Sequence, residues 1–271
     1  MKRIYRPNDN SQFLLDIRPE TAQWKYISFS VIRLAASEKI ESSTDANEIV
    51  IVPLAGRAQL SFNGETHELH RKDLFRDLPD IAYLPPRTKY RIEASETFEV
   101  AIGGAPAEGK LPARFIPRDQ IPTGIRGGAN AKRGVSTLAD SDELTERLVV
   151  YEIHTPSGNW SSFPPHRHDT RDNSSYHEET YYYRFQQENG FAIQRIYTRD
   201  TDLDVAIPVN HGDVVLIHEG YHPVVKAPGT NAYYLNILAG DVRKISAIND
   251  PNYDWISKDW EGHPIEIPLK V

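Results

Sequence analysis

Short runs rich in Val, Ile, Tyr and Phe recur along the whole chain, each bounded by Gly, Pro, Asn or Asp, and they constrain the fold more than any other feature. Runs of this length and composition are typical of strands separated by turns. They occupy residues 24–32, 48–53, 58–62, 98–102, 148–154, 180–185, 191–197, 214–218 and 232–238. Helix signals are weak and are confined to residues 140–144 and 250–259. We therefore predict an all-β chain built as a sandwich or a barrel.

The order of features in the first half returns in the second half. In each half a strand is followed by a turn, an Asp before an apolar run, and a further turn that carries Pro or Gly. The first half follows this order from Glu48 through the Asn63-Gly64 hairpin turn to Pro86, and the second half follows it from Glu179 to Gly220. The repeat predicts two similar barrels, residues 1–122 and 123–271, connected through the Pro- and Gly-rich stretch 112–128.

The composition limits the function classes that remain. The 271 residues include no Cys, which excludes disulfides, thiolate metal sites and Cys nucleophiles and fits a reducing cytoplasm. With 31 Lys+Arg against 38 Asp+Glu, the net charge is −7, so general affinity for nucleic acid is not expected. Residues 1–7 lead into polar sequence rather than the apolar core of a signal peptide, and no apolar run approaches the length of a membrane span. We expect a cytoplasmic protein without nucleic-acid or membrane partners.

The histidines are concentrated in one part of the chain. Seven of the ten lie within residues 154–222, and two of these form the pair His166-Arg167-His168. Residues two apart on a strand share a face, so His166 and His168 can bind one ion. Without Cys, any metal must be held by His and carboxylates, and neutral imidazole suits Zn, Mn, Fe or Ni. A further ligand on a neighbouring strand would complete a divalent-metal site that is open on one side.

These residues resemble the metal motifs of the cupin superfamily. In that superfamily a His-x-His pair and a Glu on the next strand form the first motif, and a Gly-Asp-apolar run leading to a His forms the second. The resemblance implies four metal ligands, which are His166, His168, Glu179 and His222. Ten residues separate His168 from Glu179, more than the common pattern has, and His218 stands where the second motif usually has Pro. Glu178 is the alternative to Glu179, but adjacent strand residues face opposite sides, so only one of the two can be a ligand.

A closer resemblance covers most of residues 158–240. The segments that carry it are 158–169, 178–184, 190–197, 212–216, 220–224 and 233–236. Together they are similar to the 5-deoxy-glucuronate isomerases of myo-inositol catabolism, a family related to the 4-deoxy-5-hexosulose-uronate isomerases. The resemblance implies a bicupin fold, with two jelly-roll barrels in tandem. It also implies conversion of 5-deoxy-D-glucuronate to 2-deoxy-5-keto-D-gluconate, which is an aldose–ketose isomerisation.

The chemistry of this reaction indicates further candidate residues. Moving a proton between adjacent carbons calls for an acid or base, for which the candidates are His177, Glu178 and Tyr183. The substrate carries a carboxylate, which Arg binds with two parallel hydrogen bonds. The candidates for that contact are Arg167, Arg184 and Arg195.

The first barrel is expected to bind no metal. Glu48 is the expected counterpart of the ligand Glu, but no His-x-His pair precedes it, and residues 85–90 carry no His where the second half has His222. Another metal-dependent cupin enzyme, such as a related uronate isomerase or an Fe(II) dioxygenase, is the alternative function. A sugar sensor would need a DNA-binding region, and the sequence has no helix-turn-helix pattern. The expected partner is a small sugar acid, and the oligomeric state is left open, with a homo-oligomer as one alternative.

Overall fold

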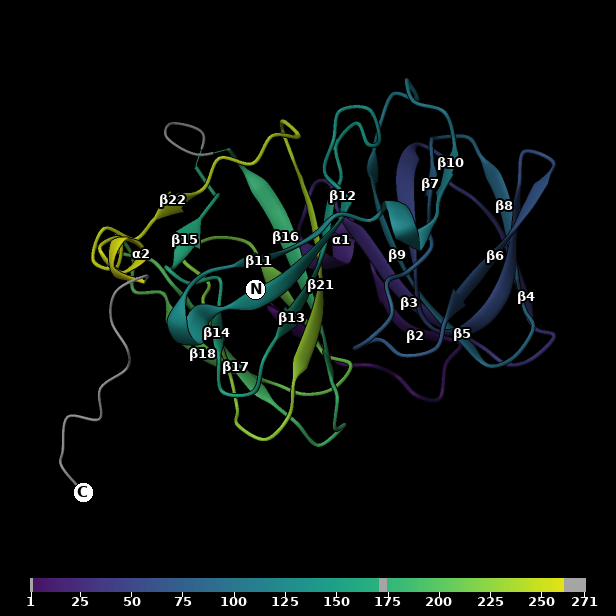
Figure 1. Ribbon diagram of the computed structural model, residues 1–271. Helices are drawn as coiled ribbons and strands as arrows, with labels where there is room; N and C mark the ends of the chain where they lie inside the picture. The colour runs from purple at the N-terminus through teal and green to yellow at the C-terminus, as the bar shows by residue number, and fades with distance from the viewer. Residues whose placement is uncertain (1, 171–174, 261–271) are drawn as a thin grey trace.

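The computed structural model describes residues 2–170 and 175–260, and almost every regular element in these ranges is a strand (Figure 1). The predicted all-β class is confirmed. The remaining regular elements are two short helices, α1 (Pro19–Ala22) and α2 (Ile256–Asp259), and two 3-10 turns, Arg118–Gln120 and Ala129–Ala131. Residues 140–144, predicted as a helix, form a bend and a turn, whereas α2 covers the end of the second predicted helix.

The first half of the chain forms one nine-stranded antiparallel sheet. Its hydrogen-bonded path runs through β10 (Arg114–Ile116), β7 (Ile81–Leu84), β5 (Asn47–Phe62), β9 (Phe98–Pro106), β3 (Ser28–Leu34) and β2 (Phe13–Ile17). Strands β6 (Glu65–Arg71) and β8 (Lys89–Ala94) join it through β5, and β4 (Lys39–Ser43) pairs with β8. The long strand β5 turns at Gly56, which has a φ of +84° and leaves an added Cβ only 2.0 Å from the Thr97 carbonyl oxygen. Strand β5 therefore pairs with β7 and β9 before the turn and with β6 and β8 after it.

The second half forms the barrel that carries the histidines. Its larger sheet runs through β1 (Ile4–Tyr5), β19 (Val214–Ile217), β16 (His177–Phe185), β21 (Ala232–Gly240), β13 (Val149–Thr155), β12 (Arg133–Ala139) and β11 (Thr123–Arg126). A four-stranded sheet contains β14 (Trp160–Ser161), β20 (Val224–Lys226), β17 (Ala192–Tyr197) and β18 (Asp204–Val209), and β15 (His166–Arg167) pairs with β22 (Ile248–Asn249). Buried side chains of the seven-stranded sheet and of the four-stranded sheet form the core of this barrel, among them Tyr183 and Ile196.

The two halves lie side by side and share a third hydrophobic core (Figure 1). Successive strand residues face opposite sides, so each central strand contributes to two cores. Ile49 of β5 points into the first barrel, whereas Val50 joins the shared core. In β16, Tyr181 points into the second barrel, whereas Tyr182 joins the shared core. This double burial explains why the central strands are apolar without interruption.

Two buried carboxylates join the halves reciprocally, and we call this pair the carboxylate clasp. Glu178 of β16 accepts hydrogen bonds from the backbone N–H groups of residues 25–27, at 2.6, 3.0 and 2.9 Å. Glu48 of β5 accepts them from the backbone N–H groups of residues 146–148, each at 2.7 Å. Each carboxylate thus belongs to one half of the chain and binds three consecutive residues of the other half.

The N-terminal segment crosses to the second barrel. Strand β1 pairs with β19, with Ile4 opposite Val215, and Arg3 forms an ion pair with Glu219 at 2.9 Å. Strand β10 belongs to the first-half sheet and β11 to the second-half sheet. The domain division at residues 122 and 123 stays a prediction.

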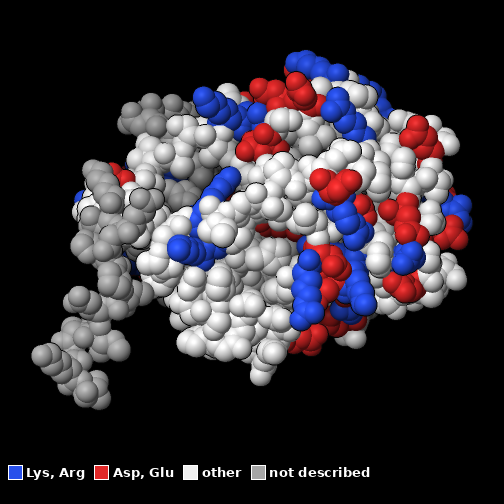
Figure 2. Space-filling view, in the orientation of Figure 1, with Lys and Arg blue, Asp and Glu red and all other residues white. Residues whose placement is uncertain are grey.

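Within residues 2–170 and 175–260, no helix has the length and apolar character needed to cross a membrane. On the face shown in Figure 2, acidic and basic side chains are intermixed over the first half of the chain. That face therefore offers no continuous basic surface.

Candidate active site

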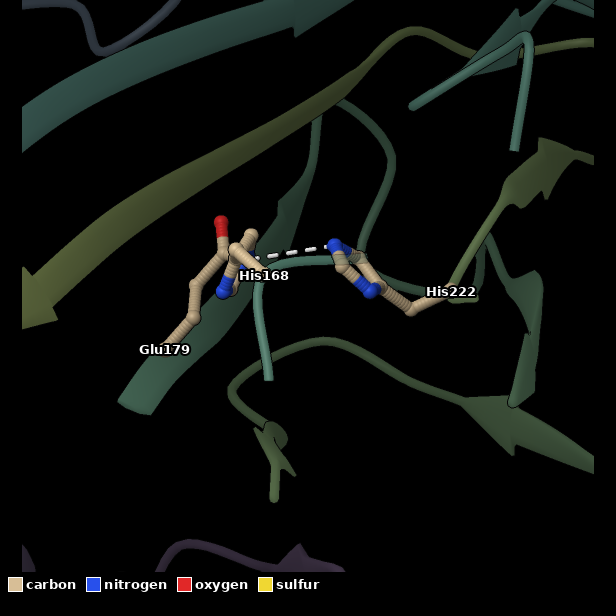
Figure 3. Close-up of side chains that lie close together, drawn as sticks. All are labelled: His168, Glu179 and His222. Carbon is tan, nitrogen blue, oxygen red and sulfur yellow. Dashed lines mark hydrogen bonds and ion pairs between the residues drawn. The ribbon is translucent and has the colours of Figure 1, made fainter. Parts of the chain in front are cut away.

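Three buried side chains of the second barrel point toward one another (Figure 3). His168 follows β15, Glu179 lies in β16, and His222 precedes β20. One potential ligand atom from each residue lies within 4.8 Å of the others. Glu179 Oε2 is 2.9 Å from His168 Nε2 and 3.2 Å from His222 Nε2. The three residues converge as the ligands of a single metal ion would.

The long insertion between His168 and Glu179 does not separate these residues in space. The backbone N–H of His177 donates to the carbonyl of His168 at 2.8 Å, and the His168 ring nitrogen Nδ1 lies 3.1 Å from the carbonyl oxygen of His177. The two ends of the insertion are therefore held together. Its length can exceed the common cupin spacing without moving either ligand.

Backbone carbonyls fix the orientation of the three imidazoles. The contacts made by Nδ1 are His166 to Pro164 at 3.3 Å, His168 to His177 at 3.1 Å, and His222 to Gly220 at 2.9 Å. Because a carbonyl oxygen only accepts, Nδ1 carries the proton in each neutral ring. The Nε2 lone pair is then free to bind a metal, which is the usual arrangement of His ligands.

The electrostatics of the group favour a bound cation. Burial raises the pKa of Glu179, but the neighbouring imidazoles of His168 and His222 outweigh that effect and hold the pKa well below its usual range. Burial lowers the pKa of His168, but the hydrogen bond with Glu179 outweighs it, so that pKa is raised. For His166, burial and the neighbouring His222 and His168 lower the pKa to about 3.

One nitrogen lacks the partner that its burial demands. His222 Nε2 is buried and makes no hydrogen bond, although Glu179 Oε2 lies 3.2 Å away. An imidazole lone pair facing a carboxylate oxygen at this distance needs a cation to stabilise it. The ring of His166 is 5.0 Å from the ring of His222 and supplies a further nitrogen at the edge of the group. Three imidazoles and one carboxylate are a donor set that suits Zn, Mn, Fe or Ni.

Two members of the group, His168 and Glu179, form part of the wall of a cavity of about 300 Å³, together with His166. Most of the polar groups that line it come from β11, β12, β16 and the segment before β15. The ionisable lining residues are Arg126, Arg133, Tyr151, His166, His168, Glu179, Tyr181 and Tyr234. A cavity of this size and polarity fits a small polar ligand.

The three candidate acids and bases lie outside this lining. Glu178 faces the first half of the chain, where backbone N–H groups occupy its carboxylate as part of the clasp. His177 contacts the carbonyl of Arg243 through Nε2 at 3.3 Å, and its own carbonyl orients His168. Tyr183 is buried in the barrel and donates to Gln194 Oε1 at 2.9 Å. Glu178 is excluded from the cavity because adjacent residues of β16 face opposite sides of the sheet. Tyr183 is excluded because its side chain lies within the core of the barrel.

The three candidate arginines are also engaged elsewhere. Arg184 pairs with Glu99 of the first half at 2.6 Å and contacts His211. Arg195 pairs with the exposed Asp204 at 2.6 Å. Arg167 lies over the ring of Tyr221, at 5.5 Å from the ring centre. These three side chains are not part of the cavity lining.

Several cavity residues are not among the site residues predicted from the sequence. Arg126 and Arg133 line the cavity from neighbouring strands, and Tyr181 brings a phenol whose Oη lies 2.8 Å from Ser162 Oγ. Asn236 donates to Glu179 Oε1 at 2.8 Å and holds that carboxylate in place. Asn236 falls in the segment 233–236 that carries the family resemblance, which is the signal that could have identified it.

Comparisons with known proteins agree with this arrangement. The chain is 40% identical over 258 residues to the 5-deoxy-glucuronate isomerase of Geobacillus kaustophilus (strain HTA426), covering 93% of each protein. It superposes on the crystal structure of an IolB-like protein from Salmonella typhimurium LT2 with a TM-score of 0.91 and 34% identity, over 94% of this chain and 99% of that one. It also resembles the oxalate decarboxylase of Bacillus subtilis, whose Mn(II) centres have been characterised, with a TM-score of 0.63 and 12% identity over 92% of this chain and 79% of that one.

Two tandem barrels, one of which brings two His and one Glu together at a single point, define a bicupin, and the likeness to the oxalate decarboxylase fold confirms that class. The sequence profile of the KduI/IolB family matches residues 3–256. The chain belongs to the KduI/IolB family.

Proposed function

We propose that this protein is a metal-dependent 5-deoxy-glucuronate isomerase of myo-inositol catabolism. The observation that carries the proposal is the agreement between a relative of that name, 40% identical over 93% of the chain, and a buried His-Glu-His group in a polar cavity. The proposed ligands of a divalent ion are His166, His168, Glu179 and His222. When bound, the ion supplies Lewis-acid stabilisation of the negative charge that develops on the substrate oxygens during enolisation.

The phenols of the cavity are suited to hydrogen bonding rather than to acting as bases. Burial, together with the charge of Glu179, raises the pKa of Tyr181 well above its usual value. Burial also raises the pKa of Tyr234, which donates to Ser161. Both phenols therefore stay protonated at neutral pH, and they can donate to oxygens of a sugar acid held in the cavity.

His177 and Tyr183 are better suited to positioning than to proton transfer. The His177 carbonyl contacts His168 Nδ1 and so fixes the tautomer of that ring. Tyr183 donates to Gln194, whose Nε2 in turn donates to the carbonyl of His222 at 3.4 Å. We infer that both residues act through the orientation of the His ligands, whereas Glu178 joins the two barrels.

The test is turnover of 5-deoxy-D-glucuronate, followed by NMR, alongside metal analysis of the purified protein by mass spectrometry. We expect 2-deoxy-5-keto-D-gluconate as product and one divalent ion per chain, with loss of both metal and turnover after chelation. Metal analysis also identifies the ion. A cytoplasmic location is part of this proposal, whereas the oligomeric state stays open, with a homo-oligomer as one alternative.

A related uronate isomerase or an Fe(II) dioxygenase is the competing assignment, and the same preparation separates them. Turnover of 4-deoxy-5-hexosulose-uronate without turnover of 5-deoxy-D-glucuronate would assign the chain to the related activity. Oxygen consumption with an iron-loaded protein would assign it to the dioxygenases. Absence of metal from a preparation that isomerises the substrate would overturn the proposed metal dependence.

A further inference from the structure

Two arginines stand side by side on the cavity wall. Arg126 of β11 and Arg133 of β12 are directly opposite each other in the antiparallel register of these strands, and both line the cavity that contains Glu179. Directly opposite residues on neighbouring strands have side chains close together on one face of the sheet. The lining of the cavity therefore includes both a basic pair and two members of the His-Glu-His group, His168 and Glu179.

Neither arginine of the basic pair has an acidic partner in the described part of the chain. No carboxylate oxygen of residues 2–170 or 175–260 lies within 4.0 Å of Arg126 or Arg133, whereas Arg184 and Arg195 of the same barrel do have such partners. Arg133 donates to the carbonyl of Ala131 at 3.1 Å, which leaves most of its five N–H groups for a ligand. A partly buried guanidinium without a counter-ion favours the binding of an anion.

The surrounding chain holds both guanidinium groups in place. Gly127, with a φ of +79°, makes the turn after β11, and an added Cβ there would lie 2.6 Å from Arg133 Nη1 and 2.2 Å from the Ala131 carbonyl oxygen. Arg126 lies 5.1 Å from the centre of the Tyr151 ring, and that phenol donates to Asp140. The Tyr151 ring thus packs against Arg126, the more exposed member of the pair.

We propose that Arg126 and Arg133 bind the carboxylate of the sugar acid, while the aldehyde end of the same molecule lies at the His-Glu-His group. This inference rests on the proposed function. Arg133 is the less exposed of the two and supplies most of the binding, because a guanidinium away from water matches a carboxylate with two parallel hydrogen bonds. Arg126 is the more exposed of the two and adds attraction for the incoming anion.

The pair also explains how the enzyme selects a sugar acid over a neutral sugar. When a sugar acid binds, its carboxylate becomes the partner of the two guanidinium groups. When a neutral sugar binds, both cations stay without a partner, and its binding is weaker for that reason. The metal alone would not make this distinction, because both sugars present the same aldehyde and neighbouring hydroxyl. Selectivity for the carboxylate is therefore the property that the basic pair should control.

The experiment compares 5-deoxy-D-glucuronate with 5-deoxy-D-glucose, which lacks the carboxylate, in wild type and in Arg133→Gln, Arg133→Lys, Arg126→Gln and the control Arg57→Gln. We expect Arg133→Gln to raise KM for the acid by about 10- to 100-fold, with a smaller change in kcat and no change for the neutral sugar. Arg133→Lys should restore part of the affinity because it keeps the charge. Arg57, in an exposed pair with Glu68, lies in the first half, so Arg57→Gln should behave as wild type.

Calorimetry with D-glucuronate as the probe separates this inference from the proposed reaction. If wild type does not isomerise 5-deoxy-D-glucuronate, the proposed function fails, but weaker D-glucuronate binding in Arg133→Gln than in wild type would still support the basic pair as the carboxylate site. If Arg133→Gln and Arg126→Gln keep the wild-type preference for acid over neutral sugar, with metal content and melting temperature unchanged, the inference is overturned. Arg133→Lys keeps the test valid if the Gln variant folds poorly.

Discussion

Replacing Glu178 by Gln should weaken the join between the two barrels and leave the chemistry of the site intact. Glu178 is almost fully buried, and its Oε2 accepts from the N–H groups of Tyr26 and Ile27 while its Oε1 accepts from Lys25. A Gln side chain offers one oxygen and one NH₂ group. With the oxygen facing Tyr26 and Ile27, the NH₂ group must face the N–H of Lys25, and that donor loses its partner.

The expected loss of stability in Glu178→Gln follows from the loss of one hydrogen-bond acceptor. A buried donor without a partner costs about 1–3 kcal/mol. A loss of about 2 kcal/mol would lower the melting temperature of a chain of this size by about 4–8 °C. Glu48→Gln is the matched variant, because Glu48 accepts from residues 146–148 with the same division between its two oxygens. We expect similar losses of stability from both variants.

The difference in stability between wild type and Glu178→Gln should also depend on pH. Burial raises the pKa of Glu178, and the backbone N–H groups only partly offset it. A carboxyl whose pKa is higher in the folded state than in the unfolded state contributes stability that is complete below the unfolded pKa and is lost as the pH rises through the folded pKa. The advantage of wild type over Glu178→Gln should therefore be greater in mild acid, near the usual Glu pKa of 4.5, than at neutral pH.

Chemical denaturation at both pH values and steady-state kinetics provide the assay. We expect Glu178→Gln to unfold at lower denaturant concentration and to keep its metal and a kcat within a few-fold of wild type. A fall in kcat of a hundredfold or more with unchanged stability would refute this reasoning and assign Glu178 to proton transfer instead. A loss of stability in Glu178→Gln without a similar loss in Glu48→Gln would contradict the reciprocal clasp.

Three further outcomes are expected. His222→Ala should weaken metal binding by at least about 100-fold while preserving the circular dichroism spectrum, and wild-type metal occupancy in this variant would contradict its assignment as a ligand. Joint replacement of His67 and His70 by Ala should leave kcat/KM near wild type, since both lie in the first half; a large loss at unchanged stability would make that half part of the site. Tyr183→Phe removes the hydrogen bond to Gln194 and should lower kcat several-fold with metal retained, and a kcat equal to wild type would exclude a positioning role.

The residues that sequence reasoning placed together are those that share a strand or a local motif. Strand alternation predicts that His166 and His168 share a face and that Glu178 and Glu179 do not, and His168, Glu179 and His222 do converge. Glu178, a candidate base, faces the side of the sheet opposite to Glu179 because of the same alternation. Alternation shows that two neighbouring residues diverge, but it does not show which of them faces the barrel.

Arg126 and Arg133 could not be found in this way. Their proximity comes from the register of β11 against β12, and the chain between them makes a tight turn at Gly127. Register depends on turn geometry and on the burial pattern of both strands, and neither was readable in this Arg- and Gly-rich stretch. The arginines chosen from the sequence lay within the segments that carry the family resemblance, where Arg195 forms an exposed ion pair and Arg184 links to the other half.

Within residues 2–170 and 175–260, the His-Glu-His group belongs to the second barrel, and the strand register identifies the corresponding positions of the first. In the second half, Glu179 lies opposite Ile217 and Leu238, and in the first half Ile49 lies opposite Leu84 and Gly104 in the same relation to the neighbouring strands. Ile49 is therefore the counterpart of Glu179. Glu48, expected from the sequence to match the ligand, is instead the counterpart of Glu178.

This correspondence divides the two adjacent carboxylates by role. Glu48 and Glu178 each bind three backbone N–H groups of the other half, so both barrels need that carboxylate to pack together. The next position points into the barrel, where Ile49 joins a hydrophobic core and Glu179 contacts His168 and His222. The acidic side chain at this position, together with His168 and His222, thus distinguishes the second barrel from the first, where the same position is occupied by a buried apolar side chain.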